Sequence, residues 1–161
     1  MIGSTNHPII FNFQHTYPQI NRELCILSFF CEITFTIMAE NSQFVVCWLD
    51  RSYGEEGAHL SLKERFRSVS NRIGEWHYFD CGDPFQEFIN THPNLRLIVI
   101  MSGSFSKNYL TPITDRTSLH SVYILCEHID RYRHLEREEQ KVQGVFNHPD
   151  DLYDKLKRDF A

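Results

Sequence analysis

Polar side chains that could bind a ligand or do chemistry follow three apolar runs of the sequence, at the point where each run ends. Asp50 and Arg51 follow the run 43–49, and Glu127 follows the run 121–126. The run 95–101 leads into Ser102, Gly103 and Ser104. Carboxylates can hold Mg²⁺ through water, and a guanidinium can pair with a phosphate through two hydrogen bonds. These six residues are therefore the candidate set for binding a small nucleotide or another phosphate compound.

The serine-glycine-serine pattern has two interpretations. Before a helix, it can offer backbone N–H groups and hydroxyls to an anion, and Gly103 can allow close approach. Yet neither of the common nucleotide-binding loops, G-x-x-x-x-G-K-[ST] and G-x-G-x-x-G, is present. In a purely structural interpretation, Ser104 caps the next helix and Gly103 supplies a turn.

Other reactive residue types do not form a catalytic pattern. None of the nine histidines forms an H-x-x-x-H pair, and none of the five cysteines forms a C-x-x-C pair. Residues 101–105 (MSGSF) fall one residue short of the G-x-S-x-G elbow of hydrolases. Cys126 ends an apolar run, where burial would raise its pKa and quench its reactivity. We therefore expect no catalytic residue, no metal ion and no resident cofactor.

The apolar runs alternate with segments of helical pattern. Leu62, Phe66, Val69 and Ile73 recur at helical spacing before Gly74. Asp83 and Pro84 predict the start of a second helix, with Asp83 as its N-cap. Further helices are expected at 108–114 and from 147–149 onward. Alternation of this kind is typical of an α/β domain with a parallel sheet. The predicted strands are 43–49, 76–79, 95–101, 121–126 and 142–146.

The most consistent arrangement is a three-layer, flavodoxin-like fold with strand order 2-1-3-4-5. The second run is short and less apolar, which suits an edge, and the third is the most apolar, which suits the centre. In such sheets ligands bind beyond the carboxyl ends of the strands, where the first and third strands diverge. The six candidate residues should therefore meet in one crevice.

Composition fits one globular domain. The chain has 161 residues, a net charge of −5 and 42% hydrophobic residues. We expect the domain at 38–161, preceded by an extension at 1–37 in which 31–37 alternates like a strand. Its apolar run, 25–38, is too short for a membrane span, and the extension lacks the basic start of a signal peptide. The acidic balance favours neither nucleic acid nor a membrane, and unpaired cysteines indicate a cytoplasmic protein.

Four segments carry a resemblance to a known kind of domain. They are 46–50 (VCWLD), 100–104 (IMSGS), 120–126 (HSVYILC) and 141–146 (KVQGVF). Together they resemble an uncharacterised α/β domain of large invertebrate proteins, found before tetratricopeptide repeats or an arginine ADP-ribosyltransferase domain. The resemblance covers roughly 43–160 and implies a sensing or adaptor module with a protein partner. The chain carries neither the repeats nor the transferase, so no transferase activity is implied.

Two better-known groups share only the strand order. Bacterial receiver domains carry a phosphoacceptor carboxylate at the end of the third strand, where this chain has Met101, Ser102 and Gly103. Toll/interleukin-receptor domains are similar in strand order but not in motifs. The sequence therefore favours a non-catalytic signalling or protein-interaction module. The alternative is a nucleotide- or phosphate-binding enzyme acting at the crevice between the first and third strands.

Overall fold

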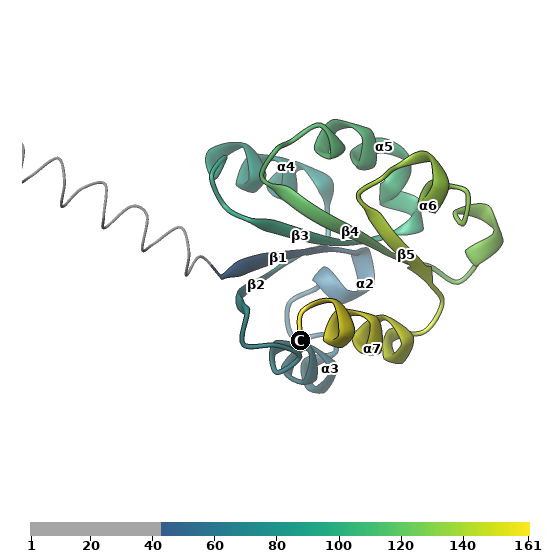
Figure 1. The fold of residues 1–161 in the computed structure, drawn as a ribbon. Coiled ribbons are helices and arrows are strands. Elements are labelled where there is room, and N and C mark those ends of the chain that lie inside the picture. Colours follow the sequence, from purple (N-terminus) through teal and green to yellow (C-terminus); the bar gives the residue numbers. More distant parts are fainter. Residues whose placement is uncertain (1–42) are drawn as a thin grey trace, which may run out of the picture. The chain divides into compact units, whose positions relative to one another are not determined.

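Five parallel strands form one sheet in the order β2-β1-β3-β4-β5 (Figure 1). The computed structural model describes residues 43–161, so the predicted extension and its strand at 31–37 lie outside the described residues. The flavodoxin-like order is confirmed, with β2 at one edge and the most apolar strand, β3, in the centre. The strands are β1 (Phe44–Leu49), β2 (Ile73–Phe79), β3 (Leu97–Ser102), β4 (Leu119–Leu125) and β5 (Val142–Phe146).

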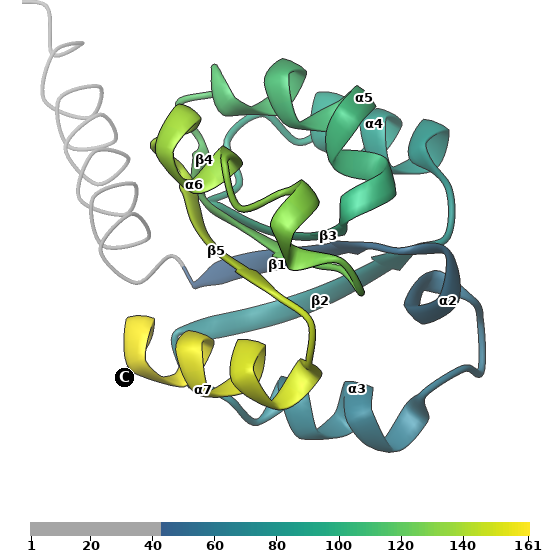
Figure 2. The same ribbon diagram turned by 90° about the vertical axis from the view of Figure 1, so that its right-hand side faces the viewer.

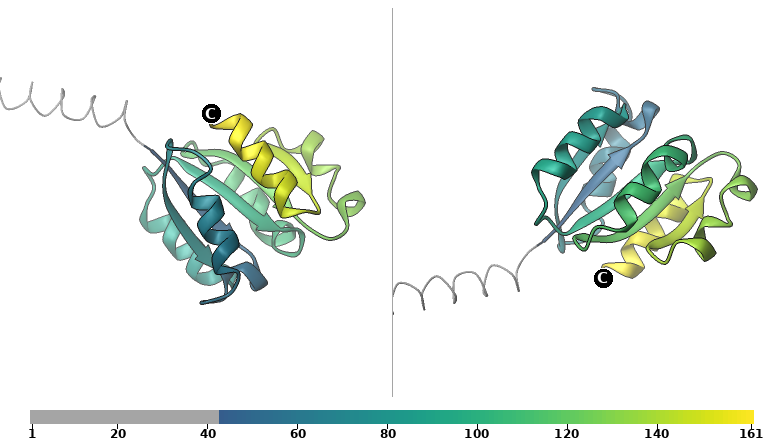
Figure 3. Two further views of the ribbon diagram at one scale, coloured as in Figure 1. Left: turned by 90° about the horizontal axis from the view of Figure 1, so that it is seen from below. Right: turned by 90° about the horizontal axis from the view of Figure 1, so that it is seen from above.

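Helices cover both faces of the sheet and complete three layers (Figure 2). One face carries α4 (Gly82–Thr91), α5 (Gly103–Thr114) and the short α6 (Leu135–Glu138). The other face carries α3 (Leu60–Arg67) and α7 (Pro149–Asp159), as the two views of Figure 3 show from below and above. A single turn, α2 (Arg51–Gly54), follows β1, and a 3₁₀ turn (Ile129–Arg131) follows β4. Within 43–161, no helix is long and apolar enough to cross a bilayer.

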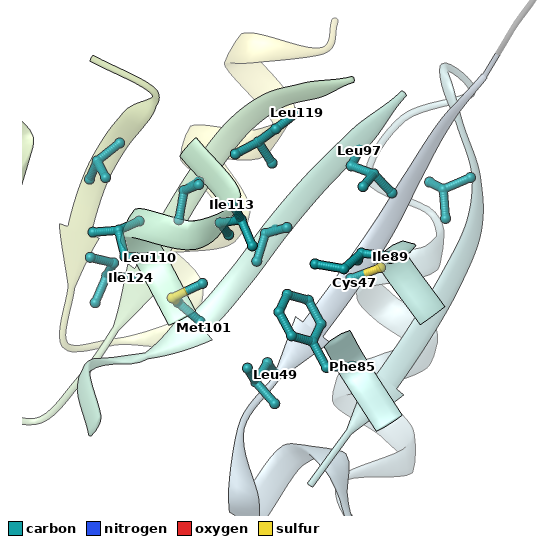
Figure 4. Packing of buried hydrophobic residues seen from close by; sticks show 14 of the residues in the cluster. Cys47, Leu49, Phe85, Ile89, Leu97, Met101, Leu110, Ile113, Leu119 and Ile124 are labelled. Atoms are coloured by element: carbon teal, nitrogen blue, oxygen red, sulfur yellow. The ribbon is translucent and has the colours of Figure 1, made fainter. Parts of the chain in front are cut away.

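The core lies on both sides of the sheet because successive strand residues point to opposite faces. All six residues of β1 are buried, which explains why its sequence is apolar without interruption. Cys47 and Leu49 pack with Phe85 and Ile89 of α4 (Figure 4). On the opposite face, Trp48 packs among side chains of α3, β2 and β3.

The boundary between α3 and β2 corrects one prediction. The helix was expected to run through Ile73 and end at Gly74, but α3 ends at Arg67 and both residues belong to β2. Phe66 and Val69 are buried as the pattern required, but Ile73 is buried because it pairs with Phe44 of β1. A buried strand residue at a helical spacing therefore mimicked a further turn of helix.

Two helix starts also differ from prediction. The N-cap of α4 is Cys81, not Asp83, and Pro84 lies inside the first turn as expected. The helix predicted at 108–114 begins five residues earlier, at Gly103, directly after β3. This earlier start places the first turn of α5 at the carboxyl edge of the sheet, among the candidate site residues. The last helix begins where predicted, with His148 as its N-cap.

Candidate ligand-binding site

The structure brings all six predicted residues together around one cavity of about 510 Å³. The cavity lies beyond the carboxyl ends of β1, β3, β4 and β5, where the strand order reverses between β1 and β3. Its size is in the usual range for a small-molecule site. Asp50, Arg51, Ser102, Gly103, Ser104 and Glu127 line it, together with Ser52, Tyr53, Leu125, Cys126, His128, Arg131, Tyr132, Asn147 and Pro149.

Asp50 is the N-cap of α2 and is only 9% exposed. Its Oδ1 accepts hydrogen bonds from the backbone N–H groups of Ser52 at 2.8 Å and Tyr53 at 3.1 Å. These bonds satisfy two of the N–H groups that a helix start leaves without an acceptor. The structure therefore gives this carboxylate a structural role, and Asp50 is a poorer candidate for Mg²⁺ than the sequence predicted. Within 43–161, no cluster of three or more His, Cys, Asp or Glu residues could hold a metal ion.

The turn α2 is held against the neighbouring strand by Gly54. A Cβ at this position would lie 2.2 Å from the backbone nitrogen of Asp80, so only glycine allows so close an approach. The ring of Tyr53 stacks on Trp48 with centroids 5.0 Å apart. Burial, followed by the charge of Asp50, raises the pKa of Tyr53, so this phenol stays neutral and can donate a hydrogen bond.

Ser102 and Ser104 contact each other at the start of α5. Their Oγ atoms lie 2.9 Å apart, and Ser102, not Ser104, is the N-cap residue. The structural interpretation of Ser104 as the cap is therefore wrong. In the part of the chain that the structure describes, no side chain accepts from the first-turn N–H groups of α5, so the positive end of this twelve-residue helix borders the cavity without a side-chain cap there.

Packing, rather than a turn, favours glycine at position 103. A Cβ on this residue would lie 2.5 Å from Cε2 and 2.6 Å from Cζ of Tyr132. The Tyr132 ring therefore rests directly on the backbone at the start of α5. This contact ties the segment between β4 and β5 to the start of α5, and Tyr132 lines the cavity beside it.

Three exposed charged groups line the cavity without a partner. Among the described residues, Arg51, Arg131 and Glu127 form no hydrogen bond or ion pair with another side chain. Cys126 also lines the cavity, but burial raises the pKa of its thiol more than the backbone of His128 lowers it. The thiol is therefore protonated at neutral pH and is a weak nucleophile. The cavity thus offers two cations, one free carboxylate and one positive helix end.

Several lining residues were not predicted from the sequence. Asn147 and Pro149 follow the end of β5, so applying the strand-end rule to the fifth strand would have found them. Arg131 and Tyr132 lie in the charged connection between β4 and β5 and also line a second cavity of about 330 Å³ between α5 and α6. No pattern in the sequence indicates that this connection folds back over the start of α5.

Comparison with known proteins adds nothing to this geometry. No family model, no curated protein and no solved structure matches the chain at a level that shows a relationship. The resemblance to the invertebrate module thus stays a prediction, and the function must be argued from the residues themselves.

Proposed function

We propose that this chain is a non-catalytic signalling module that senses a small phosphate-bearing molecule, of the size of a nucleotide, in the crevice. One observation carries the proposal: the same cavity is lined by two arginines and a helix start for which residues 43–161 supply no hydrogen-bond or ion-pair partner and no side-chain cap. Free guanidinium groups are suited to phosphate because they donate two parallel hydrogen bonds to its oxygens.

The groups that line the crevice differ in chemistry, and each suits a different part of such a ligand. The backbone N–H groups of the first turn of α5 and the hydroxyls of Ser102 and Ser104 would bind the phosphate. Arg51 and Arg131 would neutralise its charge. The rings of Tyr53 and Tyr132 supply flat surfaces for the uncharged part of the ligand.

The state of the reactive groups supports binding over catalysis. Asp50 is engaged as a helix cap, and the thiol of Cys126 is protonated. Glu127 is the carboxylate of the cavity wall that forms no hydrogen bond or ion pair with another side chain in the described region. It favours the alternative function, an enzyme that cleaves a nucleotide with Glu127 as its acid or base.

The first test is calorimetric titration of the full chain with ATP, GTP, NAD and inorganic phosphate. We expect at least one nucleotide to bind, and Arg131→Gln to weaken that binding about tenfold, as loss of about 1.4 kcal/mol would do. Arg133→Gln is the matched control, because Arg133 is exposed on the same segment but does not line the cavity. Equal affinities in both variants, or no binding of any of the four compounds, would refute the proposal.

The same samples separate sensing from catalysis. Incubating the bound nucleotide with the wild-type chain and with Glu127→Gln, followed by chromatography, shows whether it is consumed. An unchanged nucleotide agrees with a sensing module. Turnover that disappears in Glu127→Gln, while binding remains, would establish the enzymatic alternative.

A further inference from the structure

The two edges of the sheet differ in how their backbone groups are protected. At the β5 edge, the N–H of Val145 donates to Oε1 of Glu136 from α6 at 2.8 Å, so a side chain covers this edge. Within residues 43–161, no side chain hydrogen-bonds to the β2 edge in this way. The carbonyl of Phe79 accepts from Asp50 N–H at 2.9 Å, so Phe79 directs its backbone groups toward β1. Because backbone groups alternate along a strand, Trp76 and Tyr78 direct theirs toward the open edge.

These outward groups have no hydrogen-bond partner in the part of the chain that the structure describes. An unpaired strand of this kind is a template for a further strand. A strand added at this edge brings donors and acceptors to the outward backbone groups of Trp76 and Tyr78.

The side chains of β2 are complementary to a second copy of the same strand. When two β2 strands pair antiparallel about a two-fold axis through Trp76, Glu75 of each lies opposite His77 of the other. Directly opposite side chains in such a pair are close enough to hydrogen-bond, and the symmetry forms the contact twice. Within one chain, Glu75 and His77 already lie 3.1 Å apart on this face, with 69% and 35% of their side chains exposed.

We infer that the chain forms a symmetric homodimer in which the β2 strands of two copies pair antiparallel about Trp76, joining two sheets into one. His77 is positioned for this role because its ring packs on Phe88 of α4, with centroids 4.4 Å apart. The two indole rings of Trp76 then lie opposite each other on the other face of the joined sheet. This inference concerns a different surface from the crevice and does not depend on the ligand.

Sedimentation of the full chain between about 1 and 100 μM tests it, because a specific dimer with micromolar affinity dissociates across this range. We expect a monomer–dimer equilibrium. His77→Glu places a glutamate opposite Glu75, and we expect it to weaken dimerisation about tenfold, since two unfavourable pairs replace two favourable ones. The double variant Glu75→His with His77→Glu exchanges the partners and should restore dimerisation.

A second variant addresses the backbone. Trp76→Pro removes an N–H that points away from β1, so it breaks no hydrogen bond between β1 and β2 and should abolish the dimer. It also removes an indole ring that packs on Trp48 and Phe66, so its fold must be verified. Circular dichroism will show whether this variant folds. If it does not, His77→Glu and the double variant with Glu75→His test the inference by themselves. A chain that stays monomeric at 100 μM overturns the inference. So does a dimer that the charge variants do not affect, because its interface then lies elsewhere or has another register.

Discussion

Replacing Gly103 by alanine tests whether Tyr132 holds the start of α5. The new methyl group would lie 2.5 Å from the Tyr132 ring, far inside contact distance, so the ring must move away from the helix. Overpacking of this kind costs about 1–3 kcal/mol, and alanine in place of a helical glycine returns up to about 1 kcal/mol. Because the ring is only partly buried and can yield, we expect a net loss of about 1–2 kcal/mol.

A double-mutant cycle tests whether the loss of stability comes from the contact between the new methyl group and the Tyr132 ring. In a Tyr132→Ala background the methyl group meets no ring, so Gly103→Ala should be neutral or slightly stabilising. The free energy of unfolding of the four proteins, measured in urea, should therefore show a coupling of about 1–3 kcal/mol between the two positions. If Gly103→Ala costs the same with and without the Tyr132 ring, the contact does not exist in solution. If it costs nothing in stability but abolishes phosphate binding, Gly103 serves the ligand and not the packing.

Two further predictions concern the start of α2 and an ion pair. Asp50→Ala should lower the free energy of unfolding by about 1–2 kcal/mol, because two backbone N–H groups lose their acceptor, whereas Asp50→Asn should retain most of the cap. Asp80→Ala, an exposed aspartate directly after β2, is the control, and an equal loss there would contradict the assignment. The hydrogen bond from Arg65 holds the pKa of Asp150 below its ordinary value. Its contribution to stability is thus present above the ordinary pKa and lost as the pH falls through the lowered one. Arg65→Gln should raise the pKa of Asp150 in an NMR titration, and an unchanged value would refute the pairing.

The fold was largely predictable because buried parallel strands are apolar along their whole length. The predicted strand 142–146 coincides with β5. The apolarity of the runs correctly placed β2 at an edge and β3 at the centre, and the flavodoxin-like arrangement supplied the rest of the order. The predicted boundary between α3 and β2 was wrong because one residue fits both a helical and a strand pattern. Ile73 continues the apolar stripe of α3 in sequence, and only its pairing with Phe44 assigns it to β2.

The candidate site was predictable to the extent that it follows from topology. Carboxyl ends of parallel strands share one edge of the sheet, so Asp50, Ser102 and Glu127 had to lie near one another. The role of each could not be predicted, because it depends on local geometry. Asp50 is a helix cap because α2 begins directly after it. Arg131 lines the cavity because the connection between β4 and β5, which contains it, returns to the start of α5.

The direction in which the backbone groups of the β2 edge point could not be predicted from the sequence either. The carbonyl of Arg72 accepts a hydrogen bond from Phe44 of β1, and that of Phe79 accepts one from Asp50, directly after β1, although the two acceptors are seven positions apart, an odd number. Regular alternation would not allow both, and the register shift opposite Phe44 and Val45 resolves the conflict by inserting one extra residue in β2. Counting from Arg72 by alternation alone would direct the backbone of His77, not Trp76, toward the open edge. A single irregularity that the sequence does not reveal therefore decides which residues a second strand would meet. The proposed two-fold register about Trp76 rests on this irregularity and could not have been derived from the sequence.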